Sequence, residues 1–327
     1  MKCKVMINAC SPAFLSKAEE AATFLQTHRS IVDSSEETEE AVVFYADENI
    51  KEKITSGLPF RVIRLVKIKH YQPELVLDIL AELEKNSPAD IYLFPGDFSG
   101  NELAVRFAWR LKGSSLVAVE KIEANEGKLS GIKKVYSGNL RGSFLFRTKP
   151  YCFSLAKGMN RLDLAVPEDQ KTVSSHDYSA KPYDSPLIEY QETPPFQEEE
   201  VRLEKANFII AVGRGTGSSE EISRLKDIAR DLGAELGVSR PVVMNAWASM
   251  DRLLGASGSV ASPEICLALA VSGSPPFYYG IEKSKMIIAV NHDDDAPIIK
   301  AADLVIIEDY KKVIKALLEI IREEKDK

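Results

Sequence analysis

Residues 207–217 read NFIIAVGRGTG, and this stretch decides the fold of the second half of the chain. The run 207–212 is almost wholly apolar, as in a strand buried on both faces of a parallel sheet. A glycine-rich turn occupies 213–217, and an amphipathic helix follows that ends at Gly233. The apolar face of this helix consists of Ile222, Leu225, Ile228, Ala229 and Leu232. Strand, glycine turn and helix in this order form the arrangement that holds a phosphate at a helix N-terminus.

The sequence beyond this unit continues to alternate between apolar runs and amphipathic segments. We predict a helix that opens at Ser262-Pro263-Glu264 and two further strands at 286–290 and 304–307. The apolar positions of a last helix are Val313, Ile314, Leu317, Leu318 and Ile321. The pattern predicts an α/β domain over residues 204–327, built on a mostly parallel sheet flanked by helices.

The first half of the chain shows the same alternation. The expected strands are 42–45, 62–66 and 90–95, and the expected helices are 73–86 and 101–111. Glycine, serine and aromatic residues between 129 and 155 are typical of a hairpin that closes a domain. A chain of 327 residues exceeds what one hydrophobic core usually supports, so two domains are expected. We place the N-terminal α/β domain at residues 1–160.

The segment 161–203 differs from both domains. Its apolar periodicity fades, and five prolines accompany many Ser, Asp, Glu and Gln residues. We interpret it as a linker. The alternative is that part of it extends the sheet of the first domain, because long structureless stretches inside compact proteins are uncommon.

Charge and composition narrow the class of partner. The formal net charge is −7, whereas nucleic-acid binding relies on surplus Lys and Arg. No apolar run approaches the roughly 18–20 residues needed to cross a bilayer, and the N-terminal segment lacks a signal-peptide pattern. The four cysteines form no C-x-x-C pair, which favours reduced thiols. We therefore expect a cytoplasmic protein that does not bind nucleic acid and does not span a membrane.

Three loops rich in small residues stand out in the second domain, at 213–217, 254–259 and 271–276. Each alone fits a tight turn or a flexible loop equally well, and the first lacks the third glycine of the dinucleotide-binding fingerprint. That gap disfavours an NAD-dependent dehydrogenase. Together the loops would line the carboxyl edge of a parallel sheet, where open α/β sheets bind nucleotides. This analogy of fold does not identify the ligand.

Taken in order, the loop sequences closely resemble the C-terminal domain of electron-transfer flavoprotein α (large) subunits. The matching blocks are Gly213-Arg214-Gly215, Gly237 to Pro241, Gly255 to Gly258, Ala261 to Glu264, Val271-Ser272-Gly273, Ala289-Val290-Asn291 and Asp293 to Pro297. The first domain is similar in Phe94 to Ala104 and in Tyr136 to Leu140. The resemblance implies a Rossmann-like C-terminal domain that binds FAD.

The same resemblance implies which residues contact the FAD. They are Arg214, Ser239, Arg240, Leu254, Gly255, Ala256, Ser257, Ser272, Gly273, Ser274, Pro275, Pro276, Phe277, Asn291, Asp309 and Tyr310. Arg240 is expected to lie against the flavin ring, where a fixed cation favours electron-rich flavin. The alternative for Arg240 is a surface salt bridge. Ser257 keeps a hydroxyl that reaches the flavin N5.

The remaining roles concern the other end of the cofactor. Backbone N–H groups of 272–274 are implied to bind the pyrophosphate, Asn291 the ADP part and Asp309 the adenosine ribose. Ala256, Ser259 and Phe277 depart from the family, many members of which have Gln, Lys and His at these places. Losing the hydrogen bond of that histidine shifts a one-electron potential by about 60–130 mV. We therefore expect a flavin whose one-electron-reduced state is stabilised less than in typical relatives.

The resemblance further implies an electron carrier with no catalytic residues. Its FAD takes electrons from a flavin dehydrogenase of the acyl-CoA dehydrogenase type and delivers them to a second redox partner, and a smaller β subunit completes a heterodimer. The four histidines show no metal-ligand spacing, so no metal is expected. The alternative function is an FAD-free paralogue that acts as an assembly scaffold with a β-like subunit. Only the three departures at 256, 259 and 277 support it.

Overall fold

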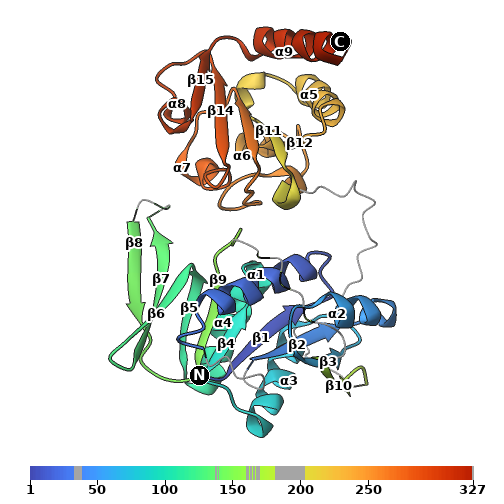
Figure 1. The fold of residues 1–327 in the computed structure, drawn as a ribbon, viewed down its shortest axis with the longest axis vertical. Helices are drawn as coiled ribbons and strands as arrows, with labels where there is room; N and C mark the ends of the chain where they lie inside the picture. The colour runs from blue at the N-terminus through green and yellow to red at the C-terminus, as the bar shows by residue number, and fades with distance from the viewer. Residues whose placement is uncertain are drawn as a thin grey trace. The chain divides into compact units, whose positions relative to one another are not determined.

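The structure is a computed structural model in which residues 1–32, 39–136, 138, 140–159, 162, 164, 166, 170–180 and 203–325 are described. The chain divides into two compact units, Met1–Glu192 and Thr193–Lys327 (Figure 1). Each has its own sheets and its own hydrophobic core. The fold class is the predicted one, because each unit is α/β with a parallel sheet flanked by helices.

The first unit contains a seven-stranded sheet in the order β10-β3-β2-β1-β4-β9-β5, in which every neighbouring pair is parallel. Its strands are β1 (Cys3–Asn8), β2 (Glu39–Tyr45), β3 (Val62–Lys67), β4 (Ile91–Phe94), β5 (Ser114–Val119), β9 (Tyr151–Leu155) and β10 (Thr172–Asp177). Its helices are α1 (Phe14–Thr27), α2 (Lys51–Gly57), α3 (Pro73–Asn86) and α4 (Phe98–Leu111). Apolar residues of α1 and α2 pack on one face of the sheet, and those of α3 and α4 pack on the other.

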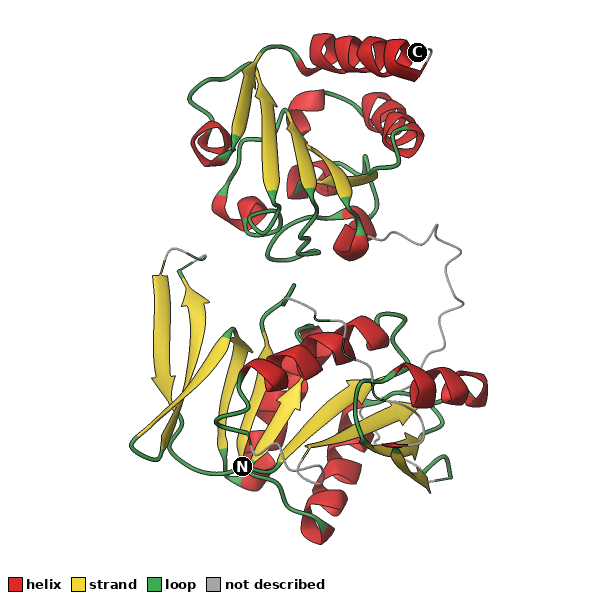
Figure 2. Cartoon of the chain, viewed as in Figure 1, coloured by secondary structure: helices red, strands yellow, loops and turns green. Residues whose placement is uncertain are grey.

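A second, antiparallel sheet belongs to the same unit (Figure 2). It consists of β6 (Lys121–Asn125), β7 (Lys128–Val135) and β8 (Leu140–Leu145). The hairpin expected between 129 and 155 is therefore present as β7 and β8. The end of that range differs, because β9 leaves the hairpin and pairs in parallel with β4 and β5 of the large sheet.

The segment 161–203 is not a linker throughout. Residues 172–177 form β10, which pairs in parallel with β3 at the edge of the large sheet. Its side chains are mostly exposed, so the strand lacks the apolar pattern that would have marked it in the sequence. This part of the chain extends the first sheet, which was the alternative interpretation. Residues 181–202 lie outside the described residues.

The second unit contains a five-stranded parallel sheet in the order β12-β11-β13-β14-β15. Its strands are β11 (Phe208–Val212), β12 (Glu235–Val238), β13 (Ile265–Leu269), β14 (Met286–Asn291) and β15 (Leu304–Ile307). Its helices are α5 (Ser219–Asp231), α6 (Arg240–Met244), α7 (Pro275–Tyr278), α8 (Pro297–Ala301) and α9 (Tyr310–Lys325). Core residues of α5, α6 and α9 pack on one face, and those of α7 and α8 pack on the other.

The predicted helix at Ser262-Pro263-Glu264 is wrong. These residues precede β13, the central strand of the sheet. Residues 266–269 of that strand are buried, with neighbouring strands on both sides, so burial and ladder hydrogen bonds outweigh the helix-start signal of Ser and Pro. This correction matters for the site, because the small-residue loop at 271–276 follows a strand of the sheet and not a helix.

The strand order reverses at the centre of this sheet. From β11 the chain moves outward to β12, and it then returns to place β13 on the opposite side of β11. Such a switch point leaves a crevice at the carboxyl ends of the strands, where open α/β sheets bind ligands.

Candidate functional site

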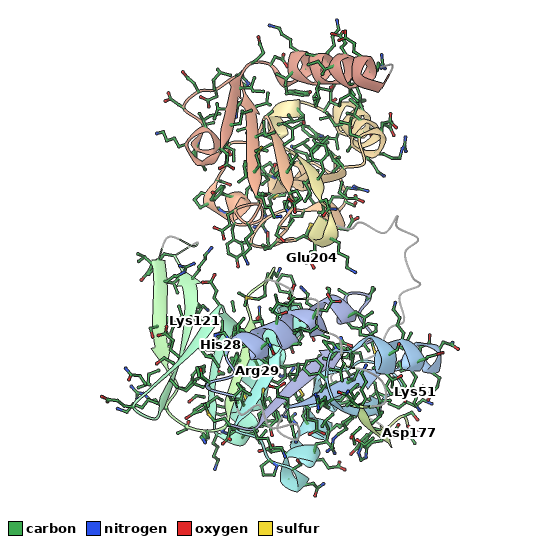
Figure 3. The ribbon with its side chains drawn as sticks, in the orientation of Figure 1. His28, Arg29, Lys51, Lys121, Asp177 and Glu204 are labelled. Carbon is green, nitrogen blue, oxygen red and sulfur yellow. The ribbon has the colours of Figure 1, made fainter. Side chains whose placement is uncertain are left out.

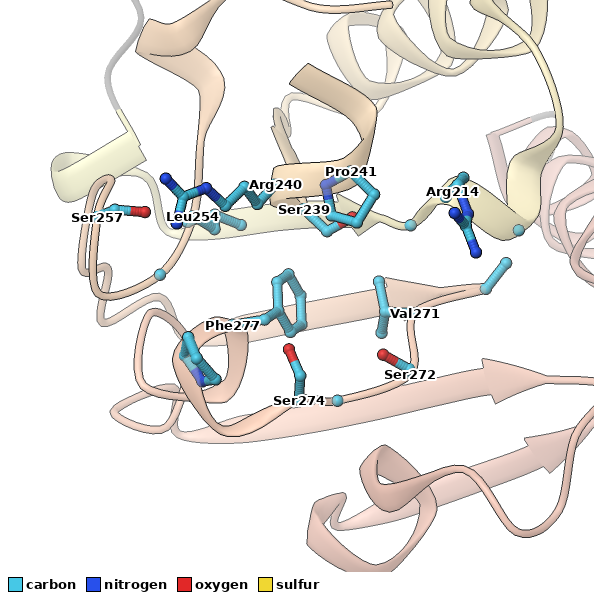
Figure 4. Close-up of a pocket in the computed structure, with 16 residues that line it drawn as sticks. Arg214, Ser239, Arg240, Pro241, Leu254, Ser257, Val271, Ser272, Ser274 and Phe277 are labelled. Carbon is cyan, nitrogen blue, oxygen red and sulfur yellow. The ribbon is translucent and has the colours of Figure 1, made fainter. Parts of the chain in front are cut away.

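The loops that follow β11, β12 and β13 enclose a pocket of about 450 Å³ at the switch point (Figure 4). This volume lies within the usual range of sites for small molecules and cofactors. The lining residues are Gly213, Arg214, Gly215, Ser239, Arg240, Pro241, Leu254, Gly255, Ser257, Ala270, Val271, Ser272, Gly273, Ser274, Pro276 and Phe277. Eleven of the sixteen predicted contacts are therefore brought together in one pocket.

The first wall of the pocket is the turn that carries Arg214. The N–H of Gly213 donates to the carbonyl of Leu269 at 3.0 Å, so this turn lies directly against the end of β13. A Cβ on Gly213 would meet the Ala270 carbonyl oxygen at 2.1 Å, and only glycine permits that approach. Residues 214–216 then form one 3-10 turn, after which Ser218 caps α5. The turn presents the Arg214 side chain to the pocket.

The second cation of the pocket is Arg240, which begins α6 at the end of β12. Ser239 before it is fixed by its N–H, which donates to the Val212 carbonyl at 2.9 Å. Neither Arg214 nor Arg240 pairs with a carboxylate in the described part of the chain, and no Asp or Glu lines the pocket. The salt-bridge alternative for Arg240 therefore has no partner among the described residues. Two unbalanced guanidinium groups make the pocket a site for an anion.

The opposite wall comes from the loop after β13. Ala270 and Gly273 both have positive φ, at 50° and 76°, which turns the chain sharply at the end of the strand. The N–H groups of Ser272, Gly273 and Ser274 donate to no acceptor within the described residues. Buried or pocket-lining N–H groups normally have a partner, so these three are available to a ligand. Free N–H groups opposite an arginine suit the oxygens of a phosphate or pyrophosphate.

The loop 254–259 closes the end of the pocket near Arg240. Gly255 has a φ of 127°, and a Cβ there would lie 2.5 Å from the Pro276 carbonyl oxygen. That same carbonyl accepts the N–H of Ala256 at 2.8 Å, so the loop is fixed against α7. Ser257 lines the pocket and Ala256 does not. Figure 4 shows Arg240 and Ser257 toward one end of the pocket and Arg214 with Ser272 toward the other.

Phe277 occupies the wall opposite Arg240 and is buried at 6% exposure. It lies in α7 and gives this wall of the pocket an apolar aromatic surface. The resemblance noted in the sequence implied a histidine here in many relatives, so that expected departure lies on the pocket wall. Pro275, which precedes Phe277 in the same helix, does not line the pocket.

Three other predicted contacts also lie outside the lining. The Asn291 side chain is buried, and its Nδ2 donates to the Val271 carbonyl at 2.8 Å. The exposed Asp309 accepts the N–H of Lys311 at 2.8 Å. The Tyr310 hydroxyl donates toward the Thr216 carbonyl at 3.2 Å. Asn291 and Tyr310 thus contact the loops that form the pocket.

Five pocket residues were not predicted: Gly213, Gly215, Pro241, Ala270 and Val271. The two glycines stand in the motif that decides the fold, so the motif itself was the signal for them. Pro241 and Val271 adjoin predicted residues. Ala270 has no signal in the sequence, because a positive φ is not expected at an alanine.

Outside this pocket, the described residues contain no group of three or more His, Cys, Asp or Glu that is placed to hold a metal ion. His28, labelled in Figure 3, is buried and accepts the N–H of Ile122 at 3.3 Å. Burial lowers its pKa, and its ring packs against Phe24 with 4.3 Å between centroids. His28 therefore has a structural role in the first core.

Two further findings concern the chain as a whole. Cys3, Cys10, Cys152 and Cys266 are all free thiols. No helix in the described ranges combines the length and the apolar character that a membrane crossing requires.

Comparisons with known proteins point to one family. Residues 202–282 match the family model of the electron transfer flavoprotein FAD-binding domain, and residues 61–181 match that of the electron transfer flavoprotein domain. The electron transfer flavoprotein subunit YgcQ of Escherichia coli K12 is 32% identical over 262 residues, which cover 75% of this chain and 83% of that protein. The protein FixB of Escherichia coli O127:H6 is 30% identical over 244 residues, covering 73% and 76%.

Proposed function

Because this chain belongs to the electron transfer flavoprotein α-subunit family, we propose that it holds FAD in the pocket of its second unit and carries electrons between redox partners. The observation that supports this proposal most is the set of donors around one pocket. Two arginines without a carboxylate partner and three N–H groups without an acceptor line it together. An elongated, doubly anionic cofactor matches that arrangement, because its phosphates meet donors and positive charge in the same cleft.

The residues fit the two ends of FAD differently. The N–H groups of Ser272, Gly273 and Ser274 would bind the pyrophosphate, with Arg214 opposite them. Arg240 and Ser257 would lie beside the flavin, where a positive charge favours its electron-rich forms. Bound FAD supplies the redox chemistry, since a flavin accepts and releases electrons singly or in pairs. The chain itself then needs no acid, base or nucleophile.

The proposed contacts to the ADP part of FAD differ from those that the resemblance implied for Asn291, Asp309 and Tyr310. Their side chains do not line the pocket, and those of Asn291 and Tyr310 contact its loops. We therefore keep the eleven lining residues as direct contacts and assign Asn291 to holding the loop at Val271.

The electron donor in this proposal is a flavin dehydrogenase of the acyl-CoA dehydrogenase type, and a second redox partner receives the electrons. A β subunit forms a heterodimer with the chain, as the family membership suggests. The proposed compartment is the cytoplasm, which the four free thiols support. The scaffold alternative has less support, because Phe277 lines the pocket and does not fill it.

The test is to co-produce the full chain with its β subunit and to identify any cofactor released on denaturation. We expect stoichiometric FAD that a reduced acyl-CoA dehydrogenase bleaches under anaerobic conditions. Arg240→Ala should weaken FAD retention by about tenfold or more, since a charged contact is worth ~1.5–3 kcal/mol. Arg230→Ala is the matched control, because Arg230 is an exposed arginine of the same unit that pairs with Asp227. A tightly assembled but colourless complex would support the scaffold instead.

A further inference from the structure

Tyr310, the first residue of α9, contacts the turn that carries Arg214 but does not line the pocket. It is 7% exposed, and its hydroxyl lies 3.2 Å from the Thr216 carbonyl oxygen and 3.1 Å from Oε2 of Glu221. Thr216 belongs to the pocket turn, and Glu221 lies in the first turn of α5. One hydroxyl on α9 therefore contacts two segments that lie 94 and 89 residues earlier in the sequence.

The chemistry of this contact favours the hydroxyl as a donor. Both neighbouring atoms are acceptors, so the single proton of Tyr310 is shared between a carbonyl and a carboxylate. Burial raises the pKa of Tyr310, and the Glu221 carboxylate raises it further, so the proton stays on the hydroxyl at neutral pH. Glu221 is oriented in turn, with Lys311 at 3.5 Å and Arg224 at 3.5 Å.

The start of the turn is anchored to β13, because the Gly213 N–H donates to the Leu269 carbonyl at 3.0 Å. The internal hydrogen bonds of the turn run from Thr216 N–H to Gly213 at 3.2 Å, from Gly217 N–H to Arg214 at 3.1 Å, and from the Thr216 hydroxyl to Gly213 at 2.8 Å. Glycines at 213, 215 and 217 give this segment high conformational freedom, and Gly217 has a φ of 98°. The Arg214 side chain has no partner among the described residues. An external contact at Thr216 is thus well placed to fix the turn.

We propose that Tyr310 is a positioning residue that holds the Arg214 turn at the correct distance from the Ser272–Ser274 loop, so that both meet the same pyrophosphate. The resemblance implied direct cofactor contact for Tyr310, and the proposal adds a role for its hydroxyl in supporting the turn. The inference rests on the proposed FAD site for its functional consequence. Its structural part concerns the chain without any ligand.

The experiment compares the full chain with its Tyr310→Phe variant. The ring is retained, so the core packing stays, and only the hydroxyl is lost. We expect the Kd for FAD to rise about five- to tenfold, the size of one lost hydrogen bond. Without FAD, the amides of Thr216 and Gly217 should exchange hydrogen faster by a similar factor. The visible spectrum of the saturated variant should match the wild type, because Arg240 and Ser257 lie at the other end of the pocket.

Tyr71→Phe is the matched control. Tyr71 is a partly buried tyrosine of the first unit whose hydroxyl also makes one side-chain contact, with Ser99. This control should leave FAD affinity and the exchange of residues 216 and 217 unchanged. A second variant, Glu221→Ala, removes the other side of the contact, and its effect on FAD affinity should not add to that of Tyr310→Phe. If Tyr310→Phe fails to fold, Glu221→Ala alone carries the test.

Two results distinguish a failure of the positioning role from a failure of the proposed function. Wild-type affinity and wild-type exchange in Tyr310→Phe would overturn the positioning role while leaving the FAD site intact. A wild-type chain that binds no FAD would overturn the proposed function, and faster exchange in Tyr310→Phe would then still support the structural contact.

Discussion

Phe277 is the aromatic residue that lines the pocket without filling it. Its ring lines the wall opposite Arg240, at the place where the resemblance implied a histidine in many relatives. A phenyl ring offers no hydrogen-bond donor to a flavin carbonyl, so the remaining stabilisation of negative charge there falls on Arg240. In the proposed function, these two residues would together influence how electron-rich a flavin the pocket favours.

Phe277→His should therefore raise the one-electron reduction potential of the bound FAD. The gain of one hydrogen bond to a charged group predicts a rise of about 60–130 mV. A potentiometric titration of the purified flavoprotein measures it. Tyr278→His, on the same helix but outside the lining, is the control and should shift the potential little. An unchanged potential in Phe277→His would show that this wall does not face the flavin.

At the scale of elements, the amino ends of β1, β2 and β3 carry a buried charged cluster. Lys4 is 2% exposed, lies 3.7 Å from Glu40 and donates to the Ser87 carbonyl. Glu40 also pairs with Arg64 at 2.5 Å. Glu84 of α3 adds a carboxylate whose Oε2 is buried without a hydrogen-bond partner in the described structure. Desolvation raises the pKa of Glu84, although Lys4 and Lys2 oppose that shift.

This shift gives a pH dependence with a definite sign. A carboxyl whose folded-state pKa is raised favours folding at low pH, and that contribution is lost as the pH rises through the folded pKa. Glu84→Gln should therefore gain stability relative to the wild type as the pH rises from 4 to 7. Denaturant unfolding at several pH values measures the difference. Glu52→Gln, on the exposed surface of α2, should follow the wild-type curve, and a flat difference for Glu84→Gln would contradict the assignment.

Most elements could be predicted because their apolar patterns are strong. The strand at 207–212, the helix ending at Gly233 and the strands at 286–290 and 304–307 are all confirmed within a residue or two at their ends. β10 escaped prediction because its exposed residues carry no apolar period. The helix at 262–264 was wrong because a local start signal competed with the central position of β13, which only the assembled sheet determines.

The site was predictable where it depends on motifs and less so where it depends on tertiary contacts. Arg214, Ser239 and Ser272 follow strand ends, so their convergence comes from the parallel sheet. The hydrogen bonds of Asn291 to Val271 and of Tyr310 to Thr216 were not predictable, since sequence spacing does not show which side chains reach the pocket loops.

At the scale of the whole molecule, the cofactor pocket belongs to one unit alone. All of its lining residues fall between 213 and 277, within Thr193–Lys327. The first unit has a sheet of similar type, yet at the carboxyl ends of β1 and β4 the residues Phe14 and Pro95 leave only about 10 Å³ of space. That volume suits a single water molecule. FAD binding should therefore act directly on the second unit.

The most direct measurement is amide hydrogen exchange on the full chain with and without saturating FAD. The N–H groups of Ser272, Gly273 and Ser274 have no acceptor in the described structure, so they should exchange rapidly alone and slow at least tenfold once phosphate oxygens bind them. Slower exchange is also expected at Arg214 and Gly215, with little change in the first sheet. Unchanged exchange at 272–274, or protection confined to residues 1–180, would contradict the account.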